Sequence, residues 1–85
     1  MPEVLVGKVV GYFAKIGVAA IEMEGAMKSG DMIRFHGHTT DFTQAVESMQ
    51  IDNAPAAEVK KGDSVGMKVK DRVRAGDVVY KLTAE

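Results

Sequence analysis

Hydrophobic and polar residues alternate along much of the chain, which is the pattern of β-strands with one buried face. In residues 18–24, the apolar side chains of Ala19, Ile21 and Met23 share one parity, and the acidic side chains occupy the other. Residues 4–13 are rich in valine and aromatic residues, with glycines at two points where a barrel strand can bend. The pattern therefore predicts a β-hairpin made of these two segments.

Three later strands are predicted from the turns that precede them. In each case a Gly-Asp pair comes shortly before a run of strand-forming residues. The pairs are Gly30-Asp31, Gly62-Asp63 and Gly76-Asp77, and the strands are residues 32–36, 65–69 and 78–82. Glycine adopts positive φ readily and aspartate hydrogen-bonds its own turn, so each pair favours a tight reversal. Repeated strand starts of this kind in 85 residues predict a compact antiparallel barrel.

Residues 40–49 are compatible with two structures. Their apolar side chains have the spacing of one helical face, namely Phe42, Ala45, Val46 and Met49. Thr43 and Val46, in contrast, favour a strand, and a bulge near Ser48 would return Val46 and Met49 to one face. The periodicity taken alone slightly favours a helix.

The composition indicates one domain spanning residues 1–85. Hydrophobic residues make up 46% of the chain, which is enough for a small core. The absence of cysteine excludes a disulfide scaffold, a thiol nucleophile and thiolate metal sites, and it favours a reducing cytoplasm. No apolar run approaches the roughly 18 residues of a membrane span, and the first residues do not form an export signal. We therefore expect a cytoplasmic protein with no membrane partner.

The net charge of −1 conceals a basic region at residues 60–74, which has six basic residues against two acidic ones. Within it, Lys68, Lys70, Arg72 and Arg74 share one parity, and apolar residues occupy the other. If the segment stays extended, four cations line one outward face and form a candidate nucleic-acid site that contacts an RNA backbone. The alternative is that they only decorate the outer face of a barrel. Aromatic residues that could stack on bases are scarce, which argues against specific RNA recognition.

The chain contains no convincing catalytic motif. Residues 25–30 have the glycine spacing of a phosphate-binding loop, but Asp31 stands where the lysine should be and would repel phosphate, so no nucleotide partner is expected. His36 and His38 could point the same way and ligate a metal together with Asp41, but this is a weak signal, and a solvated turn is the simpler interpretation. We therefore predict no catalytic residue, no metal and no cofactor, and a chain that is not an enzyme.

Taken in order, these blocks resemble the second domain of elongation factor Tu and related translational GTPases. The blocks are Gly7-x-Val9, the strand at 18–24, Met27-Lys28-Ser29-Gly30-Asp31-x-Ile33, Val46-Glu47-Ser48-Met49, Lys61-Gly62-Asp63-x-Val65-Gly66 and Ala75-Gly76-Asp77-Val78-Val79. The resemblance covers nearly the whole chain. It implies a small closed Greek-key barrel of six or seven antiparallel strands, of the translation-protein type, and a strand rather than a helix at 40–49.

The chain also departs from that family. No GTPase domain precedes the barrel, so it is expected to stand alone, without nucleotide-driven switching. The connection from Lys70 to Gly76 is short, and this compact version is similar to the barrel appended to the collagenase-like peptidase family. The partners that these resemblances imply are tRNA, ribosomal RNA, the ribosome or a neighbouring protein domain, and they do not choose among them.

Two functions follow as hypotheses. The first is a non-enzymatic binding module related to elongation factor domain 2, which contacts RNA or a ribonucleoprotein through the basic residues from Lys68 to Arg74. The alternative is a protein-interaction or accessory-subunit barrel that docks on a partner enzyme, which the modest net charge and six methionines favour.

Overall fold

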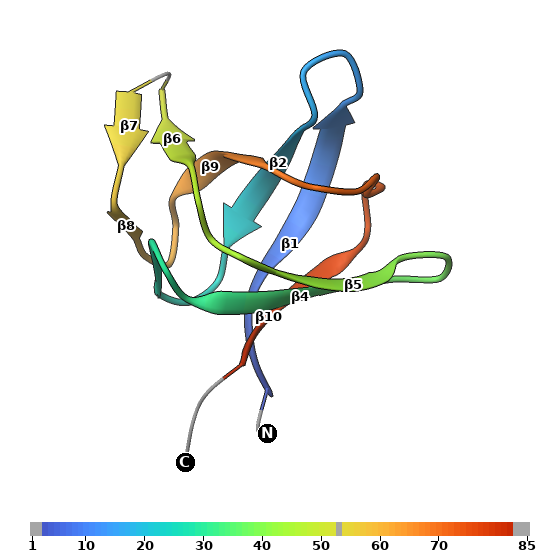
Figure 1. Cartoon of the computed structure of the whole chain (residues 1–85). Coiled ribbons are helices and arrows are strands. Elements are labelled where there is room, and N and C mark those ends of the chain that lie inside the picture. Colours follow the sequence, from blue (N-terminus) through green and yellow to red (C-terminus); the bar gives the residue numbers. More distant parts are fainter. Residues whose placement is uncertain (1–2, 53, 83–85) are drawn as a thin grey trace.

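The chain folds into strands and turns in the computed structural model, which describes residues 3–52 and 54–82 (Figure 1). In chain order the strands are β1 (Glu3–Phe13), β2 (Val18–Met23), β3 (Met27–Lys28), β4 (Met32–His36), β5 (Asp41–Ala45), β6 (Met49–Ile51), β7 (Ala54–Ala56), β8 (Glu58–Val59), β9 (Ser64–Lys68) and β10 (Val78–Leu82). The pairs that they form are antiparallel. The predicted all-β antiparallel fold is confirmed.

Eight strands form one sheet in the order β5-β4-β10-β1-β2-β9-β6-β7, and β3 pairs with β8. The sheet curls around the core like a barrel, but ladder hydrogen bonds do not close it, because β5 and β7 are its two edges. β5 and β6 follow each other in the chain, so residues 46–48 link one edge of the curled sheet to the strand beside its other edge. In place of the expected closed barrel of six or seven strands, the protein has a barrel-like open sheet.

The ladder is interrupted at the connection between β5 and β6 because Val46 bonds to a turn instead of a neighbouring strand. Its N–H donates to the carbonyl of Asp31 at 2.8 Å, and its carbonyl accepts from the N–H of Gly30 at 2.9 Å. Val46 and Met49 are both buried, as the bulged strand predicts, whereas the helical periodicity of residues 40–49 is misleading.

β1 bends at its two glycines, as the sequence predicts. Its register shifts between Leu5 and Gly7 against β10, and between Val9 and Gly11 against β2. At Gly7 a side chain would not fit, because a Cβ atom there would lie 2.8 Å from Cγ2 of Ile21. These bulges let one long strand curve across both halves of the sheet.

The three Gly-Asp turns have one geometry, and their prediction is confirmed. Gly30, Gly62 and Gly76 have φ values of 95°, 95° and 101°. In each turn a carboxylate oxygen of the aspartate accepts the backbone N–H of the residue three positions earlier, at 3.0, 2.9 and 2.9 Å for Asp31, Asp63 and Asp77. The turn motif therefore fixes where β4, β9 and β10 begin.

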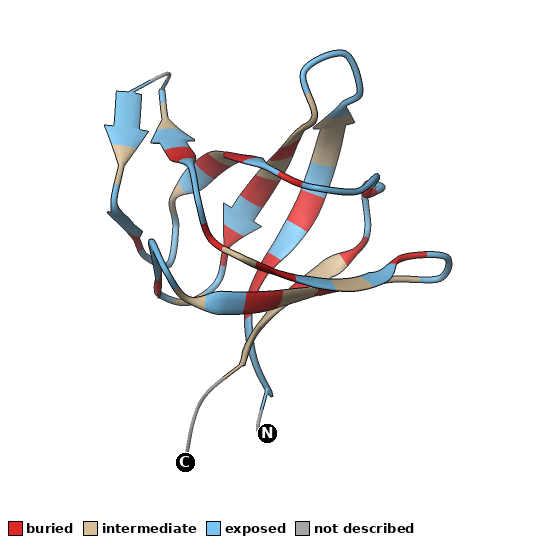
Figure 2. Ribbon diagram, in the orientation of Figure 1, coloured by how far each residue is buried: buried red, intermediate tan, exposed pale blue. Residues whose placement is uncertain are grey.

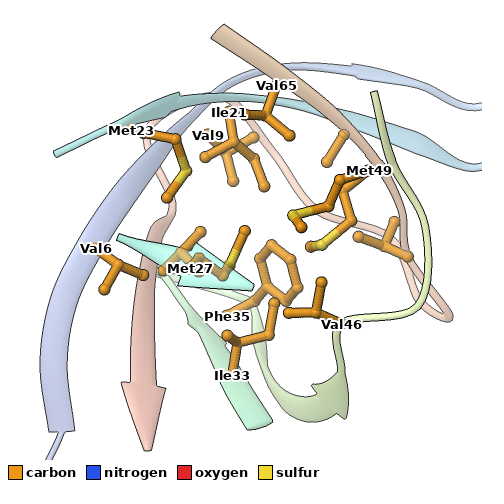
Figure 3. Packing of buried hydrophobic residues seen from close by; sticks show 14 of the residues in the cluster. Val6, Val9, Ile21, Met23, Met27, Ile33, Phe35, Val46, Met49 and Val65 are labelled. Atoms are coloured by element: carbon orange, nitrogen blue, oxygen red, sulfur yellow. The ribbon is translucent and has the colours of Figure 1, made fainter. Parts of the chain in front are cut away.

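The core lies inside the curled sheet, where one face of each long strand is buried (Figure 2). Phe35 is at its centre among aliphatic and methionine side chains from several strands (Figure 3). Its ring stacks on that of Phe42, the opposite residue on β5, with centroids 5.0 Å apart. Met23 and Met67 are buried, as expected from their parity, and Met49 is buried as well.

Candidate functional site

The basic residues predicted to bind nucleic acid lie on a segment that leaves the sheet. β9 ends at Lys68, and residues 69–77 lead to β10 without regular structure. Val69 and Val73 are buried, while the cations around them are exposed. An extended strip was expected, and this expectation is correct only as far as Lys68.

The side chain of Gln44 on β5 bonds to the backbone at the point where β9 ends. Its side-chain Nε2 donates to the carbonyl of Lys68 at 3.1 Å, and its Oε1 accepts the N–H of Lys70 at 2.8 Å. β5 does not pair with β9 as strands do in a sheet. The buried side-chain amide of Gln44 supplies hydrogen bonds between β5 and the segment after β9 in place of that pairing. This side chain adds to the backbone contacts of the segment, in which Lys68 pairs with Val18 of β2 and the N–H of Val69 donates to the carbonyl of Gly17 at 2.9 Å.

The four cations divide between two separate hollows. Lys68 and Lys70 lie beside Gln44 and Glu47 at a hollow of about 200 Å³. Arg72 and Arg74 line a different hollow of about 290 Å³, with residues 39–42 and Asp71. The two hollows have no lining residue in common, and a binding site made of all four cations stays a prediction.

The polar residues around His36 form an internal ion pair. Arg34 donates from Nε and Nη2 to the two carboxylate oxygens of Asp41 at 2.8 and 2.9 Å, and from Nη1 to Glu3 at 3.0 Å. The hydrogen bonds from Arg34 lower the pKa of Asp41 below its usual range. Within residues 3–52 and 54–82, no group of three or more His, Asp or Glu side chains could hold a metal ion.

An apolar groove lies between the tips of two hairpins at one end of the barrel. The β1–β2 hairpin supplies Val10, Phe13, Ile16 and Val18, and the β6–β7 hairpin supplies Asp52. The groove has a volume of about 340 Å³. Both hairpin tips lie away from the end where β1 begins (Figure 1). This surface was not found in the sequence analysis, although apolar residues in the turn after β1 were a signal.

The bottom of the groove is formed by residues with small side chains, which make the groove deeper. Ala20 on β2 and Gly66 on β9 are cross-strand partners, and Gln50 follows opposite Gly66 on β6. Packing does not require glycine at position 66, because a Cβ atom there would be in ordinary contact, 3.5 Å from Cγ1 of Val18. Glycine at this position leaves the hollow open without serving the fold.

Comparison with curated proteins relates the chain to enzymes named for proteolysis. It is 41% identical over 81 residues to an uncharacterized protease of Methanocaldococcus jannaschii, and 35% identical over 82 residues to a collagenase of Porphyromonas gingivalis. Each match covers 94% of this chain and 20% of the relative. The chain thus spans about a fifth of the length of these relatives. No protein-family model matches it.

The fold is that of a solved domain. The C-terminal domain of a putative U32 peptidase of Geobacillus thermoleovorans superposes with a TM-score of 0.87 at 23% identity, covering 93% of this chain and 92% of that one. Its selenomethionine variant gives a TM-score of 0.84, also at 23% identity, covering 88% of this chain and 95% of that one. The chain is similar to the C-terminal domain of U32 peptidases.

These findings correct the first functional hypothesis. The relatives are named proteases and collagenases, so the interpretation as a translation-factor-like, RNA-binding protein is wrong. The reason is that Gly-Asp turns and alternating strands report how a small barrel is built, whatever it binds. The similarity to the barrel of collagenase-like peptidases is supported. In the described residues no helix is long and apolar enough to cross a membrane.

Proposed function

We propose that this barrel is a non-catalytic accessory domain that binds protein and docks on a peptidase-type enzyme through the apolar groove. Two findings support the proposal. The chain matches only a fifth of the length of relatives named for proteolysis. The polar cluster around Arg34, which could otherwise suggest chemistry, is an ion-pair network that satisfies its own members.

The exposed apolar side chains of the groove carry this proposal. Val10, Phe13 and Ile16 have exposed fractions of 52%, 56% and 64% and gather around one hollow. Covering apolar side chains removes their surface from water, which favours association. Clustered exposure of this kind on a small domain marks an interaction site.

A capture experiment tests the proposal. The tagged protein and its Phe13→Ser variant are incubated with native lysate, and bound proteins are identified by mass spectrometry. We expect a peptidase of the collagenase-like type with the unmodified protein and at least a fivefold loss with the variant. Met32→Ser is the matched control, because Met32 is also exposed, at 43%, but does not line the groove. Equal recovery by all three proteins, or no peptidase at all, would contradict the proposal.

A further inference from the structure

We infer that the groove receives an extended segment of a partner protein, which inserts an apolar side chain beside Phe13 and Ile16 and places a lysine or arginine against Asp52. The inference rests on the proposed docking function and specifies the chemistry of the docked segment. Three features of the groove support the inference. They are an unpaired strand edge, small side chains at the bottom of the groove beside large apolar ones, and one acidic side chain.

The unpaired edge indicates an extended segment. β6 pairs with β7 along its whole length, but it pairs with β9 only at Met49↔Met67 and Gln50↔Gly66. Ser64 and Val65 continue β9 along the groove with β2 on one side, and no described strand pairs with them on the other. Alternate strand residues direct their backbone groups to opposite sides, so one of these two residues faces the open side. Such an edge pairs with an extended backbone.

The bottom and the side of the groove indicate an apolar side chain. Ala20 and Gly66 leave the outer face of the sheet low, and Val10, Phe13 and Ile16 rise beside it. A hollow of about 340 Å³ is near the lower end of the range of about 300–1,000 Å³ for ligand sites. It has room for one or two large side chains of an extended segment and is too small for a helix face.

The charge of the groove indicates a cation beside that side chain. Asp52 is the one ionisable residue among those that line the groove. It is exposed at the tip of the β6–β7 hairpin, with φ at 52°, and no described residue forms an ion pair with it. Gln50 and Ser64 add polar atoms to the lining. An exposed ion pair here selects the register of the docked segment more than it adds affinity.

Two capped peptides test this chemistry on the intact protein. The probes are acetyl-Gly-Val-Leu-Lys-Val-Gly-amide and the same peptide with glutamate in place of lysine, titrated into ¹⁵N-labelled protein. We expect the lysine peptide to shift the amide signals of Ala20, Val65 and Gly66 and to bind at least threefold more tightly than the glutamate peptide. No shifts at millimolar peptide, or equal binding of the two peptides, would overturn the inference.

Three variants connect the binding to the groove. Asp52→Asn keeps a residue that tolerates positive φ, and it should abolish the preference for the lysine peptide. Ala20→Leu fills the bottom of the groove from the outer face and should remove binding of both peptides while the spectrum remains folded. Asp71→Asn removes an exposed carboxylate outside the groove and should change neither result.

Other outcomes separate the inference from its alternatives. If the groove signals shift with protein concentration in the absence of peptide, and sedimentation shows a dimer, the occupant is a second copy and the inference is wrong. If the lysine peptide binds as expected but no peptidase is captured, the inference stands and the proposed function fails. If a peptidase is captured through Phe13 but the peptides show no charge preference, the proposed function stands and the inference fails.

Discussion

Gly37 packs against the buried carboxylate of Asp77, and this contact determines the residue type at position 37. An ideal Cβ atom on Gly37 would overlap Oδ1 of Asp77 and lie 2.6 Å from its Cγ. The same carboxylate accepts the N–H of Arg74 at 2.9 Å, so it cannot move without breaking the turn before β10. The glycine between His36 and His38 thus serves packing, which a reading of the three residues as a metal loop would miss.

Gly37→Ala should destabilise the protein by about 1–3 kcal/mol, because the added methyl group forces the Asp77 turn apart. Urea denaturation measures the change in the free energy of unfolding. Gly11→Ala is the matched control, since its Cβ atom would be 3.8 Å from that of Ala20 and fits without strain. If both variants unfold at the same urea concentration, the described packing of Gly37 is wrong.

Asp41 links the stability of the protein to pH. Hydrogen bonds from Arg34 lower the pKa of this carboxyl, so the ion pair stabilises the fold above the ordinary aspartate pKa of about 3.9. This stability is lost as the pH falls through the lowered pKa of the folded state. Asp41→Asn should therefore lower the urea midpoint at pH 7 and match the unmodified protein near pH 2.

A measurement at high salt and a control variant complete this test. Because Asp41 is exposed, the difference at pH 7 should shrink in about 1 M salt, where exposed charges are screened. Glu24→Gln removes an exposed carboxylate that forms no ion pair with described residues, and it should show no such pH dependence. A difference for Asp41→Asn that persists unchanged at acid pH would exclude the ion pair as its cause.

At the scale of the elements, the Gly-Asp turns act as separate local units. In the turn before β9, the Asp63 carboxylate accepts the N–H of Lys60 at 2.9 Å. Asp63→Ala removes this bond and should cost about 0.5–2 kcal/mol, as for comparable capping residues, whereas Asp63→Asn keeps an acceptor and should cost less. Chemical denaturation of both variants distinguishes the lost bond from the lost charge. Equal losses would mean that charge, not the hydrogen bond, matters.

The hydrogen bonds between β5 and the end of β9 depend on the side-chain amide of Gln44. Gln44→Glu keeps the acceptor for the N–H of Lys70 but loses the donor to the carbonyl of Lys68. At pH 7 we expect a loss of about 1–3 kcal/mol, because a buried carboxylate then faces a carbonyl. Burial beside a carbonyl raises the pKa of the new carboxyl, and its protonated form has a donor again, so the loss should diminish as the pH falls towards the ordinary glutamate pKa of about 4.3. Gln50→Glu, at an exposed position, should show neither effect.

At the scale of the whole molecule, Val46 lies in the segment that links edge strand β5 to β6, on the opposite side of the curled sheet. It is buried, with 2% exposure, at the point where the chain passes from β5 to β6. Val46→Ala should lower the free energy of unfolding by about 1.5–3 kcal/mol, and amide hydrogen exchange should accelerate equally in β1 and β4. Val10→Ala, with 52% exposure, is the control and should have little effect. Faster exchange confined to β5 and β6 would show that the connection between these two strands opens independently of the rest of the sheet.

The sequence by itself determined the five longer strands at 4–13, 18–24, 32–36, 65–69 and 78–82, the hairpin made by the first two, and the three turns, whereas it did not predict the short strands β3, β7 and β8. Parity along the chain separated buried from exposed residues, and glycine with aspartate marked the reversals, because both signals act within a few residues. The segment at 40–49 needed the resemblance to a known barrel, since its spacing suits a helix as well as an interrupted strand. Local signals of this kind indicate how a barrel is built but do not indicate what it binds. The RNA-binding hypothesis went beyond these signals and was wrong.

Only the tertiary structure decided the features that join distant segments. The amide of Gln44 meets the backbone 24 residues away, and Gly37 meets Asp77 where the neighbouring strands β4 and β10 end and begin. The groove likewise exists only where the β1–β2 hairpin, the low outer faces of Ala20 and Gly66, and the tip of β6–β7 come together. Each residue of the groove is ordinary in its own strand. Its shape and charge arise from the curvature of the sheet, which no short stretch of the sequence contains.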